Sequence, residues 1–185
     1  MLYTRKGDNG TTKTYACDQR ISKSSTIAEA LGNLDELNSL LGLLKVKSGT
    51  AEFKLGDINL IVSDTVGRIQ QDLFIIQAEL AGADKHIAEE KVKWLESIVD
   101  NIETTLPPIT TFFVSGGTEL AALSDFSRTI ARRAERRVVG VADEGKIVVG
   151  KETLAYLNRL SSVLYAFARN FNNKAGIKEE SPQYD

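Results

Sequence analysis

The sequence has 185 residues, 42% of them hydrophobic and 26% charged, which is typical of one soluble domain with a buried core. Its 23 Lys and Arg and 25 Asp and Glu give a net charge of −2, which argues against nucleic acid or an anionic membrane as a partner of the whole molecule. The single Cys17 excludes an internal disulfide, and the single His86 excludes a metal site built from histidines. Because we find neither a bilayer-spanning apolar stretch nor a signal-peptide pattern, we expect a cytoplasmic protein.

The chain begins with an irregular segment rich in glycine and threonine, residues 1–24, with a short strand expected over 1–5. Hydrophobic residues at three- and four-residue intervals then predict amphipathic helices. These helices cover about 25–47, 57–81, 88–105, 118–141 and 151–174. Pro107 and Pro108 end the third helix, and Thr118 has the side chain of a helix cap at the start of the fourth.

Five helices with short connections, and no convincing alternation of a strand, predict an all-α fold, an up-and-down five-helix bundle. We expect one domain over residues 1–185. It would consist of an N-terminal segment over 1–24, a bundle over 25–174 and a tail over 175–185, of which Ser181-Pro182-Gln183 resembles a frayed end.

The predicted helix 118–141 has an apolar face and, opposite to it, a basic face. With about 100° per residue, the basic face carries Arg128, Arg132, Glu135 and Arg136, with Arg133 on its flank. Guanidinium groups this close repel one another, so an anionic partner would make the face favourable. The alternative is a solvated face on which arginines pair with Glu135.

The first and last predicted helices also carry polar side chains that we expect to interact with other groups. The outer face of the last helix carries Asn158, Ser162, Tyr165 and Arg169. In the first helix, Asp35 lies near the apolar boundary, where a carboxylate favours a cation. We expect that cation to be an arginine of the basic face.

The N-terminal segment has the composition of a polyphosphate-binding loop, because glycines free backbone amides while cations and hydroxyl groups bind phosphate oxygens. Its candidate residues are Thr4, Arg5, Lys6, Gly7, Asp8, Gly10, Thr11 and Thr12. The stretch Gly7–Gly10 is equally compatible with an ordinary turn. Neither G-x-x-x-x-G-K-[ST] nor a strand-to-helix G-x-G-x-x-G occurs in the sequence.

Taken together, separated blocks of the sequence resemble the PduO-type cobalamin adenosyltransferases, in the order that this family has. The blocks are Tyr3–Thr12 (similar to Y-T-[RK]-x-G-D-x-G-x-T), Leu34–Ser39 (D-E-L-N-S), Phe112–Gly117 (F-[IV]-L-P-G-G), Ser127–Arg136 (R-T-x-x-R-R-A-E-R) and Tyr156–Ser161 (x-x-N-R-L-S). Lys23 matches a phosphate-contacting lysine of the family. The departures are Ser115 in place of proline, Ser124-Asp125 where leucine is often followed by histidine, and Ser162 in place of aspartate.

The resemblance implies a homotrimer with active sites between subunits and no nucleic-acid or membrane partner. It implies an enzyme that transfers the 5′-deoxyadenosyl group of ATP, with Mg²⁺ on the phosphates, to the cobalt of cob(I)alamin or a related corrinoid. The implied ATP-binding residues are those of the N-terminal segment with Lys23, Arg132, Arg133, Glu135, Arg136 and Asn158. The implied catalytic residues are Arg132 and the corrinoid-binding Phe112, Asp35 and Arg128.

The implied partners are a cob(II)alamin reductase and a B12-dependent enzyme. Two other functions stay open on the sequence alone: an RNA-binding bundle that uses Arg132–Arg137, and a nucleotide hydrolase with a carboxylate-bound metal. Phe112, which in the family displaces the lower axial ligand of cobalt, is alternatively a plain core aromatic.

Overall fold

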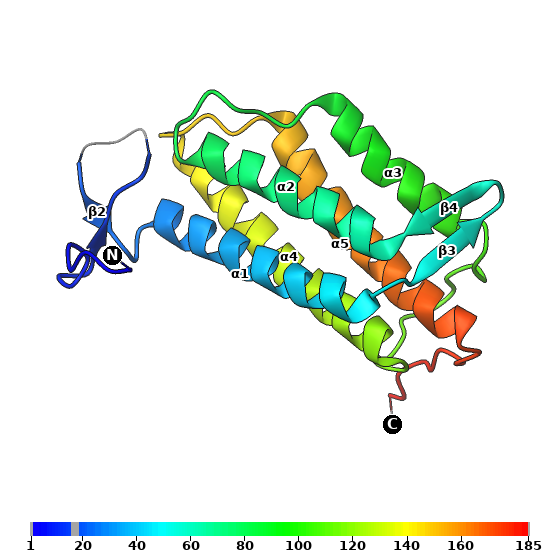
Figure 1. Ribbon diagram of the computed structural model, residues 1–185. Helices are drawn as coiled ribbons and strands as arrows, with labels where there is room; N and C mark the ends of the chain where they lie inside the picture. Colours follow the sequence, from blue (N-terminus) through cyan, green and yellow to red (C-terminus); the bar gives the residue numbers. More distant parts are fainter. Residues whose placement is uncertain (1, 16–18, 185) are drawn as a thin grey trace.

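The computed structural model describes residues 2–15 and 19–184, so Cys17 lies outside the described residues. Within these ranges the chain is mainly helical, as predicted (Figure 1). The helices are α1 (Thr26–Ser48), α2 (Val62–Leu80), α3 (Glu89–Glu103), α4 (Glu119–Glu144) and α5 (Lys151–Lys174). Four of them match the predicted ranges closely, whereas α2 begins at Val62 rather than near residue 57.

Side-chain caps explain where α1 and α4 begin. The hydroxyl of Ser25 accepts a hydrogen bond from the backbone amide of Ala28 (3.4 Å), and Thr118 accepts one from Ala121 (3.1 Å). Each bond satisfies an amide that has no partner inside the first turn of a helix. The predicted role of Thr118 is therefore confirmed.

A β-hairpin replaces the expected first turn of the second helix. Strand β3 (Glu52–Leu55) pairs antiparallel with β4 (Ile58–Ile61), with Phe53 opposite Leu60. Gly56 begins the two-residue turn at φ 60°, a conformation that glycine adopts without a steric penalty. The buried ring of Phe53 packs edge-to-face against two phenylalanines of α5, so the hairpin closes one end of the core.

The helices share one hydrophobic core. Helix α4 packs against both α1 and α5, α2 packs against α1, and α3 packs against α5 (Figure 1). The largest fully buried side chains of the helices are Leu34, Leu37, Leu41, Leu44, Ile69, Leu73, Ile76, Leu80, Leu95, Tyr156 and Phe167. They recur at helical spacing, which is the periodicity that predicted the bundle.

An N-terminal arm, residues 2–24 without the undescribed 16–18, projects from the end of the bundle at which α1 begins (Figure 1). Its ribbon consists of β1 (Thr11–Thr12) and β2 (Ile21–Ser22). The strand expected over residues 1–5 is wrong for the described part of that range, which contains no strand. Pairing with β2 instead stabilises the chain further along, at Thr11 and Thr12.

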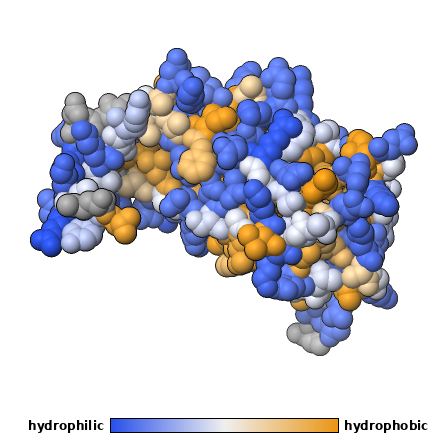
Figure 2. All heavy atoms as spheres, in the orientation of Figure 1, coloured by the Kyte–Doolittle hydropathy of each residue, from blue (hydrophilic) through white to orange (hydrophobic). Residues whose placement is uncertain are grey.

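The surface is mostly hydrophilic, with hydrophobic patches along the side of α1 and α2 (Figure 2). Large hydrophobic side chains of these helices that are exposed include Leu43, Val46 and Phe74. None of the helices described is long and apolar enough to cross a bilayer.

Candidate functional site

A cavity of about 590 Å³ lies between α4, α5 and the irregular segment that connects α3 to α4. It brings Phe112, Arg128 and Arg132 together with residues predicted on the outer face of the last helix, Ser162, Tyr165 and Arg169. The Phe112 side chain is 80% exposed, so the reading of it as a plain core aromatic is wrong. The ring is positioned on the rim of the bundle, where it is available to a ligand or a neighbouring subunit.

Arg128 is neutralised inside the chain by a residue one helical turn earlier. Its Nε donates a hydrogen bond of 2.6 Å to Oδ1 of Asp125, and its guanidinium lies 5.8 Å from the ring centroid of Tyr165. Burial raises the pKa of the Asp125 carboxyl, but hydrogen bonds from Arg128 and Ser115 outweigh it and leave that pKa below its ordinary value. Asp125 therefore stays ionised at neutral pH and orients Arg128 toward the cavity.

The expected contact between Asp35 and an arginine of the basic face does not form within one chain. Arg133 reaches α1, but it donates to Oδ1 of Asn33 (2.9 Å) and pairs with Glu36. Asp35 is exposed and lines a different cavity, of about 720 Å³, that includes Phe74. The prediction of a contact between an arginine of the basic face and a carboxylate of α1 is thus correct for the two helices. The carboxylate is that of Glu36, however, and not that of Asp35.

Glu135 is not paired with an arginine of α4, so the alternative of a solvated arginine–Glu135 ladder is wrong. Its Oε1 accepts a hydrogen bond of 2.9 Å from Nδ2 of Asn158 on α5. Arg159 donates to Oδ1 of Asn158 (2.6 Å) and to Oε1 of Glu96 on α3 (2.9 Å). These bonds fix the amide of Asn158 between α3 and α4, with its side chain on the surface.

Arg132 and Arg136 are the arginines of this face whose charge remains uncompensated. Both are exposed, and neither has a carboxylate partner in residues 2–15 and 19–184. Arg132 also lines the 590 Å³ cavity. An unpaired guanidinium beside a cavity favours an anionic ligand, because charge-assisted hydrogen bonds to phosphate or carboxylate are about twice as strong as neutral ones.

The N-terminal arm is held in shape by Arg20, which the sequence did not single out. Its guanidinium donates to Oγ1 of Thr11 (2.8 Å) and to the carbonyl oxygens of Thr11 (2.7 Å) and Lys6 (2.5 Å). The Lys23 ammonium lies beside Gly7, where a Cβ would approach it to 3.1 Å, and the Lys23 amide donates to the carbonyl of Gly10 (2.9 Å). Gly7 thus leaves room for the Lys23 ammonium group, and Gly10 lets the loop fold back onto the Lys23 backbone.

The predicted phosphate-binding groups therefore lie in two separate places. Thr12 and Lys23 line a cavity of about 460 Å³ at the start of α1, whereas Arg132 lines the cavity at the other end of α4 and α5. The sequence missed Asp125, although its spacing of three residues from Arg128 is that of a helical ion pair. Arg20 carried no comparable signal, because irregular backbone has no period.

Comparison with known proteins places the chain in one family. The family model for cobalamin adenosyltransferases matches residues 2–171. The corrinoid adenosyltransferase PduO of Salmonella typhimurium is 36% identical over 99% of this chain and 54% of its own length. The corrinoid adenosyltransferase of Bacillus subtilis is 38% identical over 95% of this chain and 89% of its own. The chain spans about half the length of the Salmonella relative and of a PduO from Citrobacter freundii.

Solved structures agree with the sequence comparison. One is a phenylalanine-to-alanine variant of a PduO-type ATP:corrinoid adenosyltransferase from Lactobacillus reuteri complexed with cobalamin and ATP, with a TM-score of 0.85, 30% identity and full coverage of both chains. Another is an arginine-to-lysine variant complexed with ATP, with a TM-score of 0.83 and 29% identity over 98% of this chain and 100% of that one. The chain belongs to the cobalamin adenosyltransferase family.

Proposed function

We propose that this member of the cobalamin adenosyltransferase family transfers the 5′-deoxyadenosyl group of ATP to the cobalt of cob(I)alamin or a related corrinoid. The observation that supports this most is the cavity that is lined both by an uncompensated arginine, Arg132, and by the exposed aromatic residue Phe112. One group suits the triphosphate of ATP, and the other suits the apolar macrocycle of a corrinoid. Of the solved relatives with this fold, one is a complex with cobalamin and ATP and another is a complex with ATP.

In the proposed reaction, an electron pair of cobalt(I) forms the bond to C5′ of ATP. The bond between C5′ and the triphosphate oxygen breaks, and its electron pair leaves with triphosphate. No proton is transferred at carbon, so the step needs no general base. The protein must instead align cobalt with C5′ and stabilise charge on the leaving group.

We propose that Arg132, Arg136 and Lys23 stabilise the negative charge on the leaving triphosphate. None of them is paired with a carboxylate in the described part of the chain. Mg²⁺ would arrive on the phosphates, and the hydroxyl group of Thr12, which lines the cavity with Lys23, would offer it an oxygen ligand. The remaining ATP contacts would come from the arm residues predicted from the sequence and from the Glu135–Asn158 pair. Arg133 would contribute indirectly, because its contacts with Asn33 and Glu36 hold α4 against α1.

The two-site geometry supports a homotrimer in which the arm of one subunit completes the cavity of another, because Lys23 and Arg132 line separate cavities of one chain. Exposed hydrophobic side chains on α1 and α2 fit the same arrangement (Figure 2). In the trimer, Asp35 of one subunit would contact Arg128 of the next. Light scattering should give three times the mass of the chain, and a monomer at every concentration would exclude it.

The reaction requires a source of cobalt(I), so we propose a cob(II)alamin reductase as a partner, and a B12-dependent enzyme as the partner that takes up the product. Phe112 would displace the lower axial ligand of cobalt(II), which makes the metal easier to reduce. Since ATP and reduced cofactors are cytoplasmic, we propose that the protein acts there.

Incubation of the purified protein with ATP and chemically reduced cob(I)alamin tests the proposal. We expect a stoichiometric appearance of adenosylcobalamin and triphosphate, and no ATP consumption without corrinoid. Arg132→Ala should abolish turnover, whereas Arg137→Ala, an exposed arginine of the same helix outside the cavity, should leave it near normal. ATP hydrolysis without corrinoid, or binding to RNA alone, would point to one of the alternative functions.

A further inference from the structure

Phe112 lies in an irregular segment, so its position depends on the contacts that this segment makes with other parts of the chain. Between the end of α3 and the start of α4, residues 104–118 form neither helix nor strand. No ladder of backbone hydrogen bonds therefore fixes the ring of Phe112 at the cavity. Other parts of the chain must hold the segment in place.

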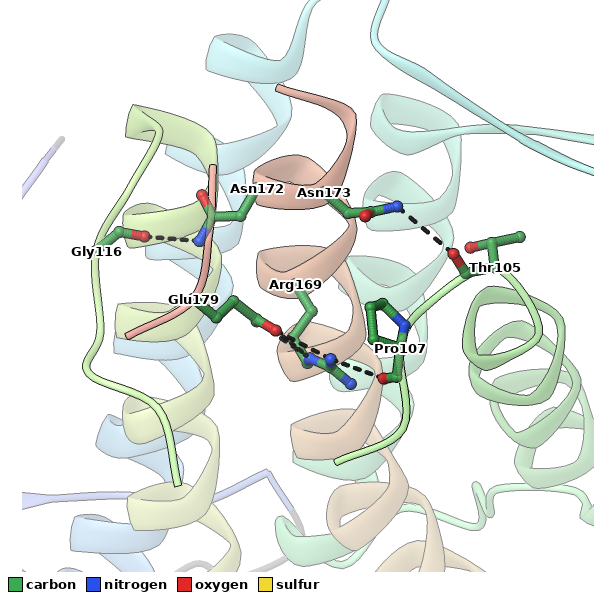
Figure 3. Close-up of polar contacts among 7 residues, drawn as sticks. All are labelled: Thr105, Pro107, Gly116, Arg169, Asn172, Asn173 and Glu179. Atoms are coloured by element: carbon green, nitrogen blue, oxygen red, sulfur yellow. Dashed lines mark hydrogen bonds and ion pairs between the residues drawn. The ribbon is translucent and has the colours of Figure 1, made fainter. Parts of the chain in front are cut away.

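Arg169 of α5 is the centre of those contacts (Figure 3). Its Nη2 donates to the carbonyl oxygen of Pro107 (3.0 Å), and its guanidinium lies 5.3 Å from the ring centroid of Phe113, next to Phe112. Nε and Nη2 together bind the carboxylate of Glu179 at 2.9–3.1 Å. The sequence placed Arg169 on an outer face, but the side chain is only 4% exposed, because the C-terminal segment covers it.

The first part of the C-terminal segment, as far as Glu180, is thus packed onto the rest of the chain. The carbonyl oxygen of Glu180 accepts a hydrogen bond of 2.8 Å from the amide of Val114, two residues from Phe112. Glu179 and Arg169 both line the 590 Å³ cavity that contains Phe112. One ion pair therefore joins α5, the C-terminal segment and the Phe112 segment at the wall of the cavity.

A second contact fixes the other end of the Phe112 segment. Nδ2 of Asn172 donates to the carbonyl of Gly116 (3.0 Å), and its Oδ1 accepts from the amide of Thr118 (3.0 Å; Figure 3 shows the first of these bonds). The position of Asn172 is fixed by α5 and not by the C-terminal segment. Its two hydrogen bonds should therefore persist when the Arg169–Glu179 ion pair is broken. Loss of the ion pair should then displace the part near Pro107 and Phe113 and leave α4 in place.

We infer that Arg169 and Glu179 are positioning residues for the corrinoid: their ion pair latches the C-terminal segment onto the cavity and holds Phe112 where the macrocycle binds. The inference rests on the proposed function. A buried guanidinium that loses its carboxylate is left uncompensated, so the latch should open rather than close on a neutral partner. Neither residue touches the proposed phosphate contacts, so ATP binding should be spared.

The test is Glu179→Gln in the full-length protein, with Glu180→Gln as the matched control. Both changes remove one negative charge, but no ion pair of Glu180 is formed in the described chain. We expect Glu179→Gln to raise the KM for cob(I)alamin about tenfold or more, with the KM for ATP within about twofold of wild type. Trypsin should also cleave faster after Lys174, at the start of the C-terminal segment and away from the changed residue, and Glu180→Gln should change none of these values.

Turnover that starts from cob(II)alamin should fall further than turnover from cob(I)alamin, since Phe112 would act before reduction. If Glu179→Gln does not fold, Glu179→Asp, which keeps the charge on a shorter side chain, carries the same test with a smaller effect. Faster cleavage with an unchanged corrinoid KM overturns the inference, as does an equal effect of Glu180→Gln. A wild-type protein without adenosyl transfer refutes the proposed function instead.

Discussion

Replacement of Phe112 by alanine separates a role in ligand binding from a role in stability. Because 80% of the side chain is exposed, about a fifth of the roughly 1.5–3 kcal/mol gained by burying a phenylalanine is at stake. The free energy of unfolding should therefore fall by less than about 1 kcal/mol. Phe167→Ala, which removes a fully buried ring from the core, is the matched control and should cost about 3–5 kcal/mol.

Urea unfolding followed by circular dichroism measures both changes. The activity of Phe112→Ala should be lost mainly when the reaction starts from cob(II)alamin, because the proposed displacement of the axial ligand precedes reduction. With chemically prepared cob(I)alamin the loss should be smaller. An equal loss from both starting states, or a stability change near that of Phe167→Ala, would refute the reasoning.

Three further changes probe the rest of the site. Asn158→Ala should abolish adenosylation while the helical circular dichroism stays unchanged, because its amide lies on the surface between Glu135 and Arg159; near-normal turnover would remove it from the ATP site. Gly117→Ala should lower the free energy of unfolding by more than about 1 kcal/mol in urea, since φ is 93° and a Cβ would lie 2.2 Å from Oδ1 of Asn172, whereas Gly32→Ala in α1, with open space around it, should not destabilise. Asp125→Asn should destabilise at pH 7. Because the folded pKa of Asp125 is below its unfolded value of about 3.9, the carboxylate's contribution is present above that pH and is lost as the pH falls through the folded pKa. The difference in urea midpoint between the variant and the wild type should therefore be smaller at pH 3 than at pH 7, and a constant difference would contradict the sign.

The helices were predictable because two independent signals agree at their positions. Leu34, Leu37 and Leu41 recur on one side of α1, and all three are fully buried. Caps such as Thr118 then mark where a helix begins. Local signals of this kind do not depend on how the rest of the chain folds, so the sequence alone carries them.

The hairpin was missed because its residues satisfy two periods at once. Ile58, Ile61 and Val62 are spaced like the buried side of a helix, so they were read as the start of α2. The alternation of Phe53 and Leu55 with charged residues, and the Gly56-Asp57 turn, favour strands instead. Contact of Phe53 with the rings of α5 decides between them, and that contact joins residues far apart in the sequence.

The polar groups of the site show the limit of a helical wheel more clearly. A wheel gives the direction of a side chain but not what lies in that direction: solvent, another segment or another subunit. Arg169 and Arg132 are both polar residues directed away from the core, yet Arg169 is buried under the C-terminal segment and Arg132 is exposed. The distinction depends on Glu179, whose position follows from an irregular path without a period.

The same distinction identifies where a ligand has to act. Arg128, Arg133 and Arg169 are each neutralised by a carboxylate of their own chain, so they can hold structure without any ligand. Arg132 has no such carboxylate in the described residues, although it lies on the same helix and the same cavity wall as Arg128. A charge left uncompensated among compensated neighbours costs little in water but gains most when an anion enters. The triphosphate of ATP would therefore be drawn to Arg132 and Arg136, while the neutralised arginines hold the surrounding side chains in place.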